Sequence, residues 1–269
     1  MITSLALTFP NIDPVAVSLF GFDIRWYALA YVIGIMLGWW LIGWLDKQQA
    51  RPILNKKLHD DMVLWGVFGV VLGGRLGYVI FYNAAYFIEH PIDIFKTWQG
   101  GMSFHGGALG VIISFFLFSK WHKLPYLRLM DLICCAVPIG LFFGRLANFA
   151  NGELFGRVTD AWYGMVFPYG GALPRHPSQL YEAVLEGTIL FSVLFLLTRK
   201  GLLRHPSFIS GAFLSGYGIA RFAIEFVREP DAHLGLLSLG LSMGQWLCIP
   251  MIIIGTSLMY WSYRRTPKT

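Results

Sequence analysis

Long apolar runs, separated by short polar segments, are the feature that most limits what this chain can fold into. A helix needs about 20 mostly apolar residues to cross the hydrocarbon core of a bilayer. The sequence contains seven such runs, at Tyr27–Trp44, Met62–Tyr82, Met102–Ser119, Leu132–Phe149, Ala183–Thr198, Ile209–Arg228 and Leu241–Tyr263. We therefore expect an all-α integral membrane protein with about seven transmembrane helices.

Composition supports a membrane protein and argues against a soluble one. Apolar residues make up 56% of the 269 positions and charged residues only 13%, whereas a soluble domain usually carries about 25% charged residues. Residues 1–269 are expected to form a single polytopic membrane domain. Its cysteines Cys134, Cys135 and Cys248 all lie in apolar runs, without metal-ligand spacing to a histidine. No metal or cofactor is therefore predicted.

Basic residues are concentrated in alternate loops, which predicts the orientation of the helices. One set of loops contains Lys47 to Lys57, Lys120 to Arg128, Arg199 to Arg204 and Arg264 to Lys268. Loops of this kind face the cytoplasm. The N-terminus is then outside, the C-terminus is cytoplasmic, and a larger segment at about residues 150–177 is exoplasmic. This loop bias also accounts for the formal net charge of +6 without nucleic-acid binding.

Ionisable residues within the runs gather toward their predicted outer ends. Charges inside a membrane are costly and usually face a protein interior or a water-filled cavity. In the sixth run, Tyr217, Arg221, Glu225 and Arg228 are spaced four, four and three residues apart, which places them on one face of a helix. Pairing of Arg221 with Glu225 accounts for part of this pattern.

An excess of arginines in this region predicts a bound anion. Arg75, Arg145, Arg221 and Arg228 outnumber the nearby acids, which are Glu182, Glu186 and Glu225. Because a guanidinium group matches the geometry of phosphate oxygens and stays ionised when partly buried, a phospholipid headgroup is the expected ligand.

Three further segments are unusually polar. Asn148, Asn151, Glu153 and Gly156 follow Arg145, where the fourth run leaves the membrane. Arg175 to Glu182 precede the fifth run, where Pro177 and Ser178 can begin a helix. His105 stands in Phe104-His105-Gly106-Gly107 and can either move a proton or hydrogen-bond a helix end.

These segments resemble those of the bacterial prolipoprotein diacylglyceryl transferases. The similarity lies in Gly144–Gly156, in Phe104–Gly107, in His176–Glu182 and in Tyr217–Arg228. It implies transfer of the diacylglyceryl group of phosphatidylglycerol to the lipobox cysteine thiol of a preprolipoprotein signal peptide, forming a thioether and releasing glycerol phosphate. It also implies a multi-pass protein of the bacterial plasma (inner) membrane whose active site faces the exoplasmic side.

The resemblance also implies roles for individual residues. His105 is similar to the residue favoured as general base, and Arg145 and Arg221 are similar to the phosphate-binding arginines. Other positions on which the family depends are matched by Tyr27, Asn148, Glu153, Gly156, Tyr217 and Glu225. We add Asn151 and Arg228 to the expected substrate-binding residues because of their places in the polar segments.

Two other classes of membrane protein are compatible with part of the pattern. A transporter or channel for an anion would also contain buried arginines, but the predicted inner halves of the runs offer few polar groups. An intramembrane protease is a third alternative, although the HExxH zinc motif is absent from the sequence.

The orientation predicts which loop positions an impermeant thiol reagent reaches. A cysteine introduced at Tyr163 should be labelled on intact spheroplasts, because its loop is expected outside the cell, whereas a cysteine at Lys57 should be labelled only after lysis. Mass-tagged maleimide followed by gel electrophoresis measures both. Labelling at position 57 but not at 163 in intact cells would reverse the topology.

Overall fold

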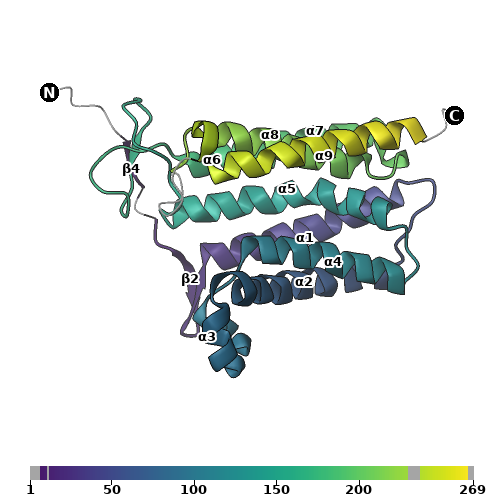
Figure 1. Cartoon of the computed structure of the whole chain (residues 1–269), viewed down its shortest axis with the longest axis horizontal. Coiled ribbons are helices and arrows are strands. Elements are labelled where there is room, and N and C mark those ends of the chain that lie inside the picture. Colours follow the sequence, from purple (N-terminus) through teal and green to yellow (C-terminus); the bar gives the residue numbers. More distant parts are fainter. Residues whose placement is uncertain (1–6, 11, 230–236, 266–269) are drawn as a thin grey trace. The chain divides into compact units, whose positions relative to one another are not determined.

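The computed structural model describes residues 7–10, 12–229 and 237–265. By its internal contacts the chain divides into unit 1, residues 1–42 and 131–269, and unit 2, residues 43–130. Figure 1 gives the labels of the helices and strands.

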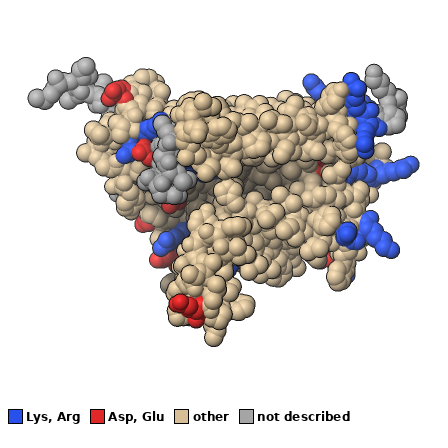
Figure 2. All heavy atoms as spheres, in the orientation of Figure 1, with Lys and Arg blue, Asp and Glu red and all other residues tan. Residues whose placement is uncertain are grey.

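Within the described residues, six helices are long and apolar enough to cross a membrane. They are α1 (Trp26–Lys47), α2 (Lys56–Tyr82), α4 (Phe104–Trp121), α5 (Tyr126–Ala150), the continuous run Ser178–Arg199, and α9 (Met243–Arg265). The remaining predicted run corresponds to a shorter apolar helix, α8 (Phe208–Ile224). Most of the surface in Figure 2 carries no charged side chain. The chain is a multi-pass membrane protein, while the count of seven and the orientation stay predictions.

In unit 2, α2 and α4 pack side by side through glycines (Figure 1). Gly69, Gly73 and Gly77 recur at four-residue intervals on α2 and face Gly106 and Gly110 of α4. A Cβ atom built on Gly110 would lie 2.7 Å from the Cα atom of Gly73. The backbones are therefore close enough to exclude side chains, which small residues at four-residue intervals allow in membrane helices.

Arg75, on α2, organises the chain between α2 and α4. This connection contains α3 (Ala84–Glu89) and the 3₁₀ turns η1 (Pro91–Phe95) and η2 (Thr97–Gln99). Arg75 is 6% exposed and donates hydrogen bonds to the carbonyl oxygens of Ile94 at 2.8 Å and Gly100 at 2.6 Å. The guanidinium of Arg75 is therefore held by backbone carbonyls within unit 2, and its expected contribution to an anion site stays a prediction.

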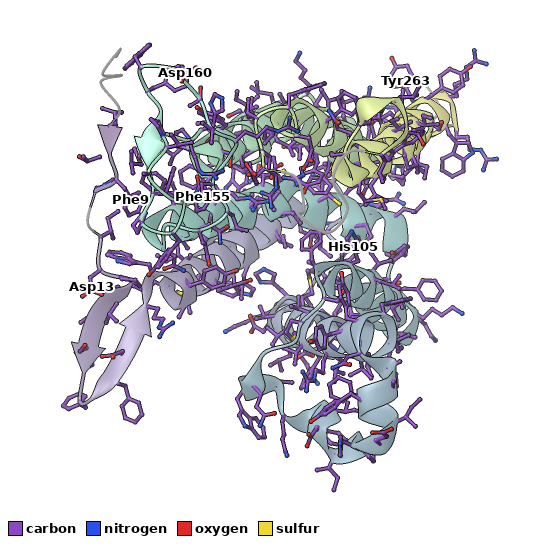
Figure 3. All side chains as sticks on the ribbon, turned by 60° about the vertical axis from the view of Figure 1, so that its left-hand side comes forward. Phe9, Asp13, His105, Phe155, Asp160 and Tyr263 are labelled. Atoms are coloured by element: carbon purple, nitrogen blue, oxygen red, sulfur yellow. The ribbon has the colours of Figure 1, made fainter. Side chains whose placement is uncertain are left out.

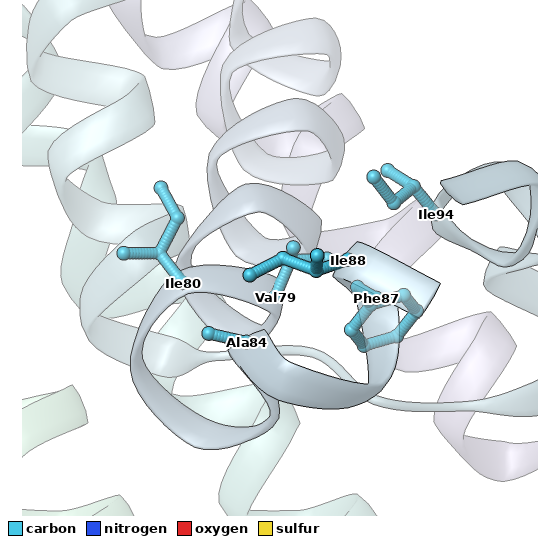
Figure 4. A pocket seen from close by; sticks show the side chains of 6 residues that line it. All are labelled: Val79, Ile80, Ala84, Phe87, Ile88 and Ile94. Atoms are coloured by element: carbon cyan, nitrogen blue, oxygen red, sulfur yellow. The ribbon is translucent and has the colours of Figure 1, made fainter. Parts of the chain in front are cut away.

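The same connection and the end of α2 line an open apolar cavity of about 240 Å³. Its wall consists of Val79, Ile80, Ala84, Phe87, Ile88 and Ile94 (Figure 4). None of these side chains can form a hydrogen bond, so the cavity offers shape and apolar contact only.

In unit 1, one helical rod brings two glutamates into the protein. The rod consists of α6 (Ser178–Glu182), the π-helical stretch η3 (Ala183–Ile189) and α7 (Leu190–Arg199). Helix α6 begins at Ser178, directly after Pro177, as the sequence predicted. A short 3₁₀ turn, η4 (Leu202–Arg204), leads from this rod to α8.

Helix α8 is anchored at its beginning by an acid from another helix. Asp131 of α5 is fully buried and accepts hydrogen bonds from the backbone nitrogens of Ser207 and Ser210, each at 2.7 Å. These nitrogens lie at the start of α8, where backbone N–H groups have no partner within the helix. Asp131 therefore ties α5 to α8, which also packs along α9 (Figure 1).

The end of α8 differs from the prediction. The sixth run was expected to continue to Arg228, but the helix ends at Ile224 and Glu225 caps it. Beyond that point the chain joins a loop, because Arg157 donates its backbone N–H to the carbonyl of Val227 at 2.8 Å. Arg228 forms a β-bridge with Gly156. Pairing with this loop replaces the last helical turn.

Short strands supplement the helices at the N-terminal segment and in the large loop. Strand β1 (Leu7–Thr8) runs parallel to β4 (Met165–Val166), and β2 (Val15–Leu19) is antiparallel to β3 (Phe22–Arg25). Next to β1 and β4, Phe9 and Phe155 each have a ring centroid 5.3 Å from that of Phe167; Figure 3 labels Phe9 and Phe155. The segment at about residues 150–177 therefore has its own aromatic core. A 3₁₀ turn, η5 (Ser238–Gly240), precedes α9.

The glycine packing in unit 2 makes a stability prediction. Gly110→Ala should lower the free energy of unfolding by about 1–3 kcal/mol, because the methyl group forces the backbones of α2 and α4 apart. Gly140→Ala in α5 is the matched control, since a Cβ atom there meets nothing within 4 Å. Thermal unfolding in detergent measures both variants, and equal midpoints would contradict the packing account.

Candidate active site

The centre of the site is Glu182, a fully buried carboxylate at the end of α6. Its Oε2 atom lies 2.8 Å from Nη2 of Arg145 on α5 and 3.5 Å from Nη1 of Arg221 on α8. Its Oε1 atom lies 3.0 Å from Nη1 of Arg228. One carboxylate therefore holds three guanidiniums that come from distant parts of the sequence.

A second carboxylate, Glu225, joins this cluster to the start of α9. Glu225 forms an ion pair with Arg221, and its other oxygen accepts a hydrogen bond from the hydroxyl of Ser242 at 2.6 Å. Ser242 is itself held by Gln245, whose side-chain oxygen accepts from the Ser242 backbone N–H at 2.9 Å. The predicted pairing of Arg221 with Glu225 is confirmed. Ser242 and Gln245 were missed, because small polar residues at a helix start carry no distinctive signal.

The cluster is balanced in formal charge. Its members are Arg145, Arg221, Arg228, Glu182, Glu186 and Glu225. The expected excess of arginines depended on Arg75, which binds carbonyl oxygens in unit 2. The cations of the cluster are nevertheless more exposed than its central anion. The side chains of Arg145 and Arg221 are 18% and 17% exposed, while the side chain of Glu182 is fully buried. An anion approaching from outside therefore meets guanidinium groups before it meets carboxylates.

In the segment at about residues 150–177, position 156 has to be a glycine, because a side chain there would collide with the backbone of His176 and Val227. The Gly156 N–H donates to the carbonyl of His176 at 2.8 Å, and a Cβ atom at position 156 would lie 2.8 Å from Cβ of His176. The neighbouring Arg157 donates through Nε to the carbonyl of Arg228 at 2.8 Å. Gly156 thus lets the loop pass close to His176 and Arg228. Arg157 was missed because an arginine in a loop is usually solvated.

The exit of α5 is fixed by a compact hydrogen-bond network. Oε1 of Glu153 accepts from the side-chain amides of Asn148 at 2.9 Å and Asn151 at 3.3 Å. The backbone carbonyl of Glu153 accepts from the Gln179 amide at 2.6 Å. Gly152 makes the turn possible with a φ of +66°. Asn148, Asn151 and Glu153 are therefore brought together, directly after the helix that carries Arg145.

The remaining predicted site residues lie in three different places. Tyr217 is on α8, one turn before Arg221, and stacks on Phe213 with 6.0 Å between ring centroids. Tyr27 is near the start of α1, 38% exposed, and its ring lies 5.1 Å from that of Tyr31. His105 is the second residue of α4 in unit 2 (Figure 3), where Ser103 caps the helix by accepting from the Gly106 N–H at 3.1 Å. His105 belongs to unit 2, whereas Tyr27, Tyr217 and the ion-pair cluster belong to unit 1.

No metal site is formed by the part of the chain that the structure describes, as it contains no suitable group of three or more His, Cys, Asp or Glu. The centre of the site is formed by three guanidinium groups in contact with one buried carboxylate, that of Glu182. Guanidinium groups are well matched in geometry to carboxylate and phosphate oxygens.

The helices and the buried ionic cluster define a multi-pass membrane protein with an internal polar site. The family model for prolipoprotein diacylglyceryl transferase matches residues 14–261. The chain belongs to this family, and it is an enzyme of the transferase class.

Relatives from other bacteria match almost the whole chain. Each of the following proteins is named phosphatidylglycerol–prolipoprotein diacylglyceryl transferase. The protein of Paramagnetospirillum magneticum is 55% identical over 267 residues, covering 98% of this chain and 99% of that protein. The protein of Rhodospirillum rubrum is 53% identical, with 97% and 96% covered, and the protein of Pseudomonas aeruginosa is 52% identical, with 96% and 97% covered.

Because Glu182 is the hub of the cluster, in contact with three arginines, its replacement is expected to lower stability. Glu182→Gln should destabilise the protein by about 3–5 kcal/mol, because three partly buried guanidiniums lose their shared counter-charge. Glu229→Gln is the matched control: Glu229 also pairs with an arginine, Arg175, at 2.9 Å, but its side chain is 50% exposed, so its loss should change stability little. Thermal unfolding in detergent compares the two, and a similar small effect in both would show that Glu182 is not the hub.

Proposed function

We propose that this chain transfers the diacylglyceryl group of phosphatidylglycerol to the lipobox cysteine of preprolipoproteins, the first step of bacterial lipoprotein maturation. The proposal rests on the observation that this chain belongs to the prolipoprotein diacylglyceryl transferase family. More than half of its residues are identical to those of named relatives over nearly the full length. The guanidinium cluster supplies a matching chemical feature, because the donor lipid carries a phosphodiester anion.

In this proposal Arg145 and Arg221 bind the phosphate. Both side chains are partly exposed and both rest on Glu182, which holds the two guanidiniums in place before a lipid arrives. Prepositioned donors stabilise charge without the cost of reorganisation during the reaction. Arg228, held by the same carboxylate at 3.0 Å, is positioned to assist.

The proposed reaction is a displacement at carbon. His105 removes the proton from the substrate thiol, whose ordinary pKa is about 8.5. The thiolate attacks the glycerol methylene that bears the phosphate ester, so that a C–S bond forms while the C–O bond breaks. The electron pair of the broken bond remains on the phosphate oxygen, and glycerol phosphate leaves with an additional negative charge. Arg145 and Arg221 stabilise that charge.

The other residues are assigned to positioning and substrate binding. Glu225 orients Arg221, and Gly156 gives the loop its close approach to Arg228. Asn148, Asn151 and Glu153 shape the exit of α5. Tyr27 and Tyr217 are assigned to contacts with the lipid or the signal peptide.

The cellular setting follows from the predicted orientation. We infer that the protein lies in the bacterial inner membrane with its active site toward the exoplasmic side. There it meets both phosphatidylglycerol and the signal peptide of a secreted preprolipoprotein, whose lipobox contains the acceptor cysteine.

The test is transfer by the purified protein. Incubation with phosphatidylglycerol and a lipobox peptide should increase the peptide mass by one diacylglyceryl group, as measured by mass spectrometry. No adduct from folded protein would contradict the function.

Within the same assay, Arg221→Lys should reduce kcat/KM at least tenfold although it keeps the charge. A lysine cannot make the two-pronged contact, and the loss of one charge-assisted hydrogen bond costs about 1.5–3 kcal/mol. Arg204→Lys is the control, because Arg204 lies on η4 and donates to His205 rather than to the cluster. Equal activity of the two variants would remove the phosphate-binding role from Arg221.

A further inference from the structure

Glu186 is a buried carboxyl group that has no assigned role in the proposed reaction. It lies one turn after Glu182, in the π-helical stretch η3, and it is fully buried. Neither of its oxygens has a hydrogen-bond partner among the described residues. The nearest guanidinium, that of Arg145, is 3.6 Å from Oε2. π-Helical turns are rare and occur often at functional sites.

Among the described residues, the only ion-pair partner of Glu186 is already shared with Glu182. Arg145 places Nη2 at 2.8 Å from Glu182 and at 3.6 Å from Glu186. A carboxylate in such a position is ionised at a high cost, because burial without hydrogen bonds disfavours the charged form. Its ionised form depends on the electrostatic attraction of Arg145.

The charged and titratable groups around Glu186 come from several elements. Arg145 on α5, Glu182 on α6, Tyr217 and Arg221 on α8, Arg228 after α8, and Cys248 on α9 all act on it electrostatically. Three of these six groups are cations, and each of those three cations is also held by Glu182. An anion that binds to these three cations therefore weakens the electrostatic attraction between them and Glu186.

We propose that Glu186 takes up a proton when the lipid phosphate binds, so that the buried cluster stays electrically neutral. The three arginines and the three glutamates balance in the free protein, and a phosphodiester adds one negative charge. Protonation of Glu186 removes one negative charge. Glu182 and Glu225 keep their negative charges, because each forms a close ion pair with a guanidinium group. This inference rests on the proposed function, since it takes phosphatidylglycerol as the ligand.

The sign of the pH dependence follows from this coupling. Because the bound state holds one proton more than the free state, affinity rises as pH falls, by at most about tenfold per pH unit. The phosphodiester itself stays a monoanion across the range from pH 5 to 9, so it contributes no slope. Glu186→Gln mimics the protonated carboxyl, and its affinity should equal the low-pH affinity of the native protein at every pH.

The experiment is calorimetric titration of the full-length protein in detergent with dihexanoyl-phosphatidylglycerol between pH 5 and 9. Repeating it in buffers of different ionisation enthalpy counts the protons taken up, without any variant. We expect close to one proton per lipid for the native protein over part of this range, and none for Glu186→Gln.

His176→Gln and His105→Gln are the controls, because a histidine that gained a proton on binding would give the same sign. Burial lowers the pKa of His176 below its ordinary value, which leaves it neutral over most of the range. Both variants should keep the proton uptake of the native protein. Loss of uptake in either one, or its persistence in Glu186→Gln, would overturn the assignment to Glu186.

Two further outcomes separate this inference from the proposed function. Binding of the lipid with no proton uptake at any pH would overturn the role of Glu186 and leave the transferase reaction intact. Absence of lipid binding by folded native protein across the whole range would count against phosphatidylglycerol as the ligand, and therefore against the proposed function itself.

Discussion

The structure of unit 1 depends on the burial of one carboxylate, Glu182, among three guanidiniums. In an apolar surrounding an isolated charge is very costly, so each partner is held by the others. Because Arg145, Arg221 and Arg228 come from α5, α8 and the chain after α8, this single group fixes three segments around α6. The same arrangement leaves the guanidiniums partly exposed and the acid enclosed, which is the polarity that an anionic substrate requires.

The surrounding polar groups serve to hold this cluster in place. Glu225 links Arg221 to α9 through Ser242, and Glu153 closes the exit of α5 through Asn148. The large loop approaches the cluster at Gly156, where a side chain would collide, and at Arg157, which donates to the carbonyl of Arg228. The loop that carries the proposed substrate-binding residues is in this way attached to rigid helices, which favours a site that is formed before the lipid arrives.

Much of this arrangement could be predicted from sequence where the signal is local. The apolar runs predicted the helices, and the spacing of Arg221 and Glu225 predicted their ion pair. Features set by tertiary contacts were missed. Nothing local shows that Arg75 turns toward backbone carbonyls, that α8 ends at Ile224 because the next residues pair with a loop, or that Ser242 holds Glu225. His105 was singled out from its glycine-flanked position, and the family resemblance then favoured it as the general base.

The most direct test of the central claim is an experimental structure of the protein with phosphatidylglycerol bound. We expect the phosphate oxygens within about 3.2 Å of guanidinium nitrogens of both Arg145 and Arg221, with Glu182 still in contact with Arg228. A lipid phosphate bound elsewhere, with all three arginines still closed on Glu182, would contradict the account.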